Sequence, residues 1–158
     1  MKELARVYDT PWPKGPVRVE TVFAISSRSA FTSLDPTVVT VATSSMRNAG
    51  LAAAETLFHE ASHALVQKVL NEIVRVEKSQ KKTLRDRDLW HAIVFYTTGR
   101  VVRAQLSELE PYADRYGLWT NDWPGLLPVI ERGWGPWLDG KSSLRTAIQQ
   151  VVAEAPSR

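Results

Sequence analysis

The sequence predicts an α+β fold in which a small N-terminal β-sheet packs on a long helix and a mainly helical part follows. Residues 17–25 and 37–43 are rich in β-branched side chains and partly alternate, which is typical of strands. Residues 51–76 contain neither proline nor glycine, and their apolar side chains recur at helical spacing. From residue 111 onward, proline and glycine separate short apolar segments, which indicates short helices joined by turns.

The remaining segments complete this single predicted domain, which spans residues 1–158. Residues 1–16 contain three prolines and one glycine, and we expect an extended arm there. Residues 26–35 are expected to be turn-like, because polar residues predominate there and Asp35-Pro36 follows. A second helix is predicted over 87–106, and a final amphipathic helix over 142–154.

Composition excludes several classes of protein. The chain has 158 residues, of which 44% are hydrophobic and 23% charged, and these values are typical of soluble globular domains. No apolar run reaches the roughly 18 residues that a membrane-spanning helix requires. Cysteine is absent, so neither disulfides nor thiolate metal ligands are available. The net charge of +3 is small, and the basic stretch 78–87 contains no aromatic residue, which disfavours nucleic-acid binding.

The N-terminus carries no apolar segment of the kind found in signal peptides. Because a signal peptide removed before residue 1 would leave the same sequence, the compartment is left open. The oligomeric state is left open as well.

The residues His59-Glu60-Ala61-Ser62-His63 lie within the helix predicted over 51–76. Residues four apart on a helix differ in direction by only about 40°, so both imidazoles can reach one metal ion. Zinc accepts neutral imidazole, and catalytic zinc sites use three protein ligands and one open position. Glu60 is placed to take a proton from water at the metal and to deliver it to a leaving amine. The spacing therefore predicts two zinc ligands and a general base.

The third ligand is predicted to be His91, the one remaining histidine of the chain. It falls near the start of the second predicted helix, and residues 64–90 are long enough to return the chain antiparallel to the first helix. Glu110 is the alternative, but Pro111 directly follows it and it arrives late in the chain. Imidazole is a preferred zinc ligand, and we therefore rank His91 above Glu110.

The order of strands, HExxH helix and second ligand-bearing helix over residues 17–107 resembles the zincin metallopeptidases, particularly compact relatives of the gluzincins. This resemblance implies zinc ligation by His59 and His63, a general base at Glu60, and a peptide or protein substrate that pairs in extended form with an edge strand, here residues 37–43. Gluzincins take their third ligand from a glutamate in the second helix, whereas no glutamate lies between residues 94 and 107. His91 is the natural substitute. The longer metzincin motif HExxHxxGxxH is absent, because Leu65-Val66-Gln67-Lys68-Val69 places neither the glycine nor the histidine that it requires.

The expected function is thus zinc-dependent hydrolysis of peptide bonds, and the alternative is a non-catalytic zinc-containing binding protein on the same scaffold. A side chain that stabilises the oxyanion is predicted at Tyr96, with Arg100, Tyr112 and Tyr116 as further candidates. Four of the six tryptophans follow residue 118, and we expect them to fill a C-terminal core rather than to line a substrate subsite. Residues 11–13 are a candidate for an aromatic segment lying across the cleft.

Overall fold

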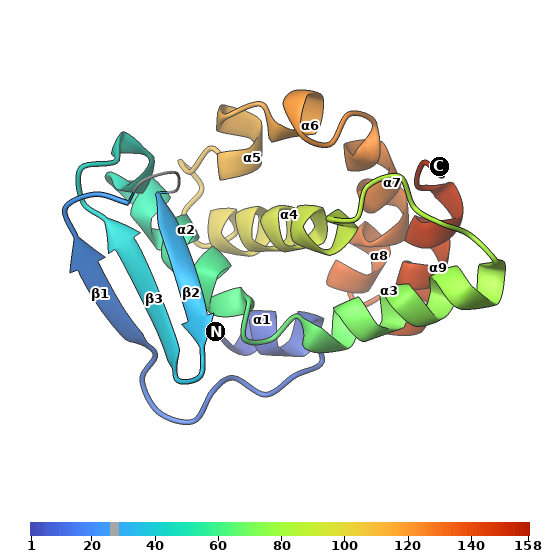
Figure 1. The fold of residues 1–158 in the computed structure, drawn as a ribbon, viewed down its shortest axis with the longest axis horizontal. Helices are drawn as coiled ribbons and strands as arrows, with labels where there is room; N and C mark the ends of the chain where they lie inside the picture. The colour runs from blue at the N-terminus through green and yellow to red at the C-terminus, as the bar shows by residue number, and fades with distance from the viewer. Residues whose placement is uncertain (26–28) are drawn as a thin grey trace.

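The computed structural model describes residues 1–25 and 29–158. Within this part of the chain, nine α-helices and one three-stranded sheet confirm the predicted α+β class and the N-terminal position of the sheet. In Figure 1 the sheet forms one end of the molecule, while α3, α7, α8 and α9 form the other, and α4 runs between them. The helices are α1 (Lys2–Val7), α2 (Leu51–Ser62), α3 (Gln67–Gln80), α4 (Leu89–Arg103), α5 (Tyr112–Arg115), α6 (Leu118–Asn121), α7 (Leu126–Gly133), α8 (Gly135–Leu138) and α9 (Leu144–Glu154), and a 3-10 helix, η1, covers Met46–Asn48.

The sheet has the strand order β1-β3-β2, so the strand expected at its edge lies in its centre. β3 (Thr37–Ala42) pairs in parallel with β1 (Arg18–Val22) and antiparallel with β2 (Ala30–Leu34). The prediction of a turn is therefore wrong for residues 30–34, and residues 26–28 of that predicted turn lie outside the described residues. A five-residue segment with two hydroxyl side chains has only a weak intrinsic preference for the strand conformation. β2 is therefore a strand because it pairs with β3.

One face of the sheet packs on α2. Val39 and Val41 of β3, Ala30 of β2 and Ala61 of α2 form a small buried cluster. Residues paired across the sheet share a face, and Thr32, the partner of Val39, therefore points toward α2 as well. The sheet thus holds β2 against the helix that carries the HExxH residues.

The predicted helix over 51–76 is two helices. α2 ends at Ser62, and α3 begins at Gln67. Between them the amides of residues 63, 64 and 65 donate to carbonyls three residues earlier, which tightens the turn. No proline or glycine causes this break. Leu65 and Val66 are buried in the turn itself, because α2 packs on the sheet and α4 whereas α3 packs on α9. The HExxH residues consequently lie at the C-terminal end of a helix rather than in its middle.

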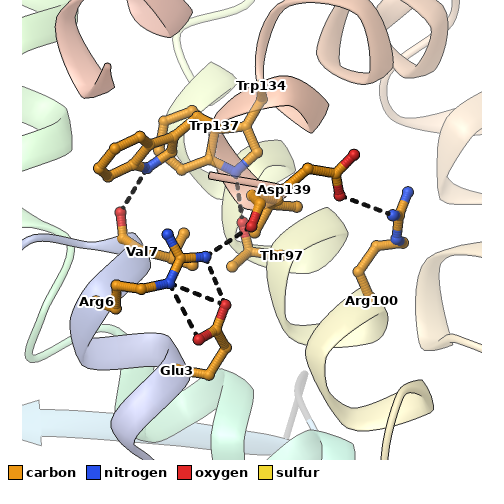
Figure 2. Close-up of polar contacts among 9 residues, drawn as sticks. Glu3, Arg6, Val7, Thr97, Arg100, Trp134, Trp137 and Asp139 are labelled. Carbon is orange, nitrogen blue, oxygen red and sulfur yellow. Dashed lines mark hydrogen bonds and ion pairs between the residues drawn. The ribbon is translucent and has the colours of Figure 1, made fainter. Parts of the chain in front are cut away.

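Residues 1–16 are not extended throughout, because Lys2–Val7 form α1, with Leu4 and Val7 buried. Figure 2 shows how this short helix is attached to the C-terminal part of the chain. Arg6 Nη2 donates to the carbonyl of Leu138 at 2.6 Å, and Trp137 Nε1 donates to the carbonyl of Val7 at 2.8 Å. A helix of six residues is not stable alone, so these tertiary contacts account for it. The proline-containing segment begins only after α1.

The C-terminal tryptophans lie in or against the main core, which they share with α1, α3 and α4, rather than in a separate C-terminal core. Trp134 is fully buried, and its Nε1 donates to Thr97 Oγ1 of α4 at 2.8 Å (Figure 2). The predicted second and final helices correspond to α4 and α9, and the Ser143 hydroxyl caps α9 by accepting from the Thr146 amide. Among the described residues, no helix combines the length and the apolar character that crossing a membrane would require.

Candidate metal centre

Three histidines converge at the junction of α2 and α4. His59 lies in the last turn of α2, His63 directly follows that helix, and His91 is in the first turn of α4. His59 Nε2 is 3.1 Å from His91 Nε2 and 3.4 Å from His63 Nε2. One ligand atom from each of the three residues lies within 4.8 Å of the others, and the group could hold a metal ion. The structure therefore brings together the three histidines that the sequence singles out.

The spacing of these nitrogens fits a small tetrahedral ion. Nitrogen ligands about 2.0–2.1 Å from zinc at tetrahedral angles are about 3.3 Å from one another. The two Nε2 separations at His59 lie on either side of that value. Three imidazoles without a thiolate or a carboxylate are a donor set that suits zinc among the common divalent ions.

The surroundings of His59 keep its imidazole neutral. Burial, followed by the proximity of His91 and His63, holds the pKa of His59 well below its usual 6.5. The ring of Phe95 packs against that of His59 with 4.0 Å between centroids, and Trp90 stacks on His91 at 4.9 Å. Because neutral imidazole is the form that binds metal, this apolar packing favours ligation near neutral pH and orients the rings.

Glu60 lies in the same cleft as the histidines, and its side chain is largely buried. The hydroxyl of Thr32 on β2 is 2.8 Å from Glu60 Oε2 and 2.8 Å from the carbonyl oxygen of Glu60. β2 therefore positions the carboxylate of the predicted general base. Thr32 is a site residue that the sequence analysis misses, because it expects a turn at this position.

The cleft has a volume of about 860 Å³ and combines polar and aromatic side chains. The strand β2, η1, the helices α2 and α4, and the start of α5 all contribute to it. Among the described residues it is lined by Ser29, Ala30, Phe31, Thr32, Arg47, Glu55, Thr56, His59, Glu60, His63, Asp88, Trp90, His91, Phe95, Tyr112 and Asp122.

Tyr96, the predicted oxyanion-stabilising residue, does not line this cleft. It is buried on another side of α4, where its Oη accepts a hydrogen bond from Arg100 Nη1 at 3.0 Å. Five residues beyond His91 correspond to a rotation of about 140° on a helix, whereas Phe95, four residues beyond, faces the histidines. Of the further candidates, Tyr112 does line the cleft.

Glu110, the alternative third ligand, is exposed and forms an ion pair with Arg115 at 3.4 Å. It is not among the described residues that line the cleft. None of residues 1–16 lines the cleft either, so the structure gives no support for an aromatic segment lying across it.

Glu55 is a second buried acid in the cleft, one helical turn before His59. Its Oε2 accepts a hydrogen bond from the Tyr112 amide at 2.8 Å, whereas its Oε1 is buried with no hydrogen-bond partner among the described residues. Burial raises the pKa of Glu55 to about 7, and the Tyr112 amide only partly opposes this effect. In the sequence, its spacing of four residues from His59 places it on the same face of the helix.

We expect Glu55→Gln to change how stability depends on pH in protein kept metal-free with a chelator. An acid whose pKa rises from 4.5 to about 7 on folding binds more protons in the folded state between these values. The wild-type free energy of unfolding should therefore fall as pH rises from 5 to 8, by on the order of 3 kcal/mol relative to the variant. Urea unfolding at both pH values measures this difference. Glu108→Gln, at an exposed glutamate, is the control, and parallel curves for wild type and Glu55→Gln would contradict the assignment.

Comparison of the chain with protein-family models, curated proteins and solved structures gave no match. What the site can do chemically therefore rests on its own residues and their geometry.

Proposed function

We propose that this protein is a zinc-dependent metallopeptidase that hydrolyses peptide bonds. The proposal is carried by one observation, the cluster of three imidazole nitrogens beside Glu60 in a cleft that β2 borders. A zinc ion held by His59, His63 and His91 would act as a Lewis acid on water and on the substrate carbonyl. Three protein ligands would match the ligand number of catalytic rather than structural zinc sites.

Glu60 is the proposed general base. It would take a proton from the attacking water and deliver it to the amine of the leaving group. The hydrogen bond from Thr32 restrains its carboxylate, and restraint of this kind reduces the reorganisation that proton transfer requires.

β2 is the proposed strand for substrate pairing, in place of residues 37–43. β3 occupies one side of β2, and no strand among the described residues pairs with the other side. Ala30, Phe31 and Thr32 of β2 line the cleft, so an extended peptide that pairs with this edge would pass the histidines.

Tyr112 replaces Tyr96 as the proposed oxyanion donor. Its Oη accepts a hydrogen bond from Arg47 Nη1 at 3.0 Å, which leaves the phenolic hydrogen available to donate. An oxyanion at the scissile carbon would require such a donor in addition to the metal.

The test is hydrolysis of a broad peptide library by zinc-loaded protein, followed by mass spectrometry. We expect cleavage that a chelator abolishes and that added zinc restores. Tyr96→Phe is the matched control, since Tyr96 lies outside the cleft, and its turnover should equal that of the wild type. Absence of cleavage in protein that carries one zinc per chain would contradict the proposal and favour a non-catalytic zinc-binding protein.

A further inference from the structure

Arg47 places a cation in the cleft that no acid in the described part of the chain neutralises. Among the described residues that line the cleft, it is the one lysine or arginine. No carboxylate in the described part of the chain lies within ion-pair distance of its guanidinium, although ten ion pairs form elsewhere there. Arg47 is exposed, and its guanidinium contacts the rings of Tyr112 and Tyr116 rather than a carboxylate.

The guanidinium is held in place before any ligand binds. Its backbone belongs to η1, where the Ser45 hydroxyl accepts from the Arg47 amide. Asn48 Nδ2 attaches η1 to the sheet by donating to the carbonyls of Ser29 and Ala42 at 2.7 and 2.8 Å. These contacts fix the backbone from which the Arg47 side chain extends.

Two tyrosines orient the side chain itself. The guanidinium carbon lies 4.7 Å from the centre of the Tyr116 ring, and Nη1 donates to Tyr112 Oη at 3.0 Å. The hydrogen bond to Tyr112 uses one of the five N–H donors of the guanidinium. No other acceptor in the described residues takes a hydrogen bond from this side chain, so the remaining donors can meet a planar, doubly accepting group such as a carboxylate.

Four acids and one cation line the described cleft, and the acids are Glu55, Glu60, Asp88 and Asp122. Asp88 and Asp122 are close in sequence to Trp90 and Trp123, whose rings contact His91, whereas Glu55 accepts a hydrogen bond from the Tyr112 amide at 2.8 Å. Arg47 contacts Tyr112, whose ring lies 5.4 Å from that of Phe95, one helical turn beyond His91 on α4. Arg47 therefore supplies the one positive side chain of the described lining that a negatively charged group could approach.

We propose that Arg47 is the centre of a subsite that binds a carboxylate of the substrate. The inference rests on the proposed peptidase function and assigns its substrate class, namely peptides with a carboxylate on the side of the scissile bond that lies toward η1 and α5. That carboxylate belongs either to an acidic side chain or to the C-terminus of the peptide. Tyr112 accepts a hydrogen bond from Arg47, and its ring also contacts Phe95, which packs against His91.

The experiment compares matched peptides with zinc-loaded wild-type protein. One pair differs by glutamate against glutamine at each position around the cleaved bond, and a second pair by a free against an amidated C-terminus. We expect kcat/KM to be at least about 10-fold higher for the carboxylate member of one pair, which corresponds to the lower end of the free energy of a hydrogen bond to a charged group. The pair that shows the preference identifies which of the two carboxylates is bound.

In Arg47→Gln this ratio should fall to about one, and in Arg47→Lys it should be intermediate, because lysine keeps the charge but loses the planar donor pair. Arg103→Gln removes the same charge from the exposed surface of α4 and should leave the ratio at the wild-type value. Thermal unfolding of each variant separates loss of the subsite from loss of the fold. A wild-type ratio near one for both pairs, or a preference that persists in Arg47→Gln, would overturn the proposal.

A binding measurement keeps this test independent of the proposed function. If no peptide is cleaved, the same peptide pairs are titrated against zinc-loaded Glu60→Gln by calorimetry. Tighter binding of the carboxylate member, lost when Arg47→Gln is added, would support the subsite even though the peptidase proposal had failed. Equal affinity for both members of each pair would overturn the subsite.

Discussion

Replacement of His91 with alanine is expected to remove the metal from the protein. The variant keeps the nitrogens of His59 and His63 but loses the one that lies 3.1 Å from His59 Nε2. Two imidazoles and water bind zinc far more weakly than three imidazoles do, because the remaining position must be filled from solvent. We expect the affinity to fall by more than about 100-fold, the upper end of the loss that outer-sphere partners of a metal cause. Elemental analysis after dialysis, with chelator competition for the affinity, measures the result.

Glu110→Ala is the matched control, because Glu110 is the alternative ligand and the structure places it outside the cleft. This variant should retain the metal content of the wild type. Circular dichroism of His91→Ala should show helical content close to that of the wild type, since α4 keeps its packing against α2. Full metal retention in His91→Ala, or loss of metal in Glu110→Ala, would refute the three-histidine site.

Glu60→Gln is expected to retain the metal and to lose hydrolysis. Glutamine has nearly the shape of glutamate, and its amide oxygen can still accept the hydrogen bond from Thr32. It cannot accept a proton from water near neutral pH. The loss of kcat should therefore be about 10²- to 10⁴-fold, the range in which positioned acid–base groups contribute to catalysis. Initial rates with a cleaved peptide, at equal zinc content, measure this effect.

Thr32→Val provides a graded comparison for Glu60. Valine matches the shape of threonine but cannot donate to Glu60, so the carboxylate remains while its restraint is lost. We expect a smaller fall in kcat than in Glu60→Gln. Turnover by Glu60→Gln close to the wild-type rate would exclude this residue as the base, whatever the effect of Thr32→Val.

The sequence alone identifies the features that depend on short spacing and on composition. His59 and His63 share a direction because they are four residues apart on a helix, and no tertiary information is needed to see it. His91 follows by elimination among three histidines, together with the length of chain that separates it from the motif. The change from β-branched segments to apolar residues at helical spacing likewise predicts strands followed by helices. The structure confirms the α+β class.

The tertiary structure alone decides the features that depend on which segments meet. No proline or glycine in the sequence indicates the break between α2 and α3. The break arises because α2 packs on the sheet and α4, whereas α3 packs on α9. β2 exists as a strand through its pairing with β3, and this pairing brings Thr32 to Glu60. Arg47 and Tyr112 are far apart in the chain and meet in the cleft only because η1 and α5 flank α2. Hydrophobic periodicity indicates which residues of one helix or strand share a face. It does not indicate which elements pack together, and these contacts depend on that packing. The histidines that could hold a metal ion are therefore predictable from the sequence, and the contacts of Thr32 with Glu60 and of Arg47 with Tyr112 are not.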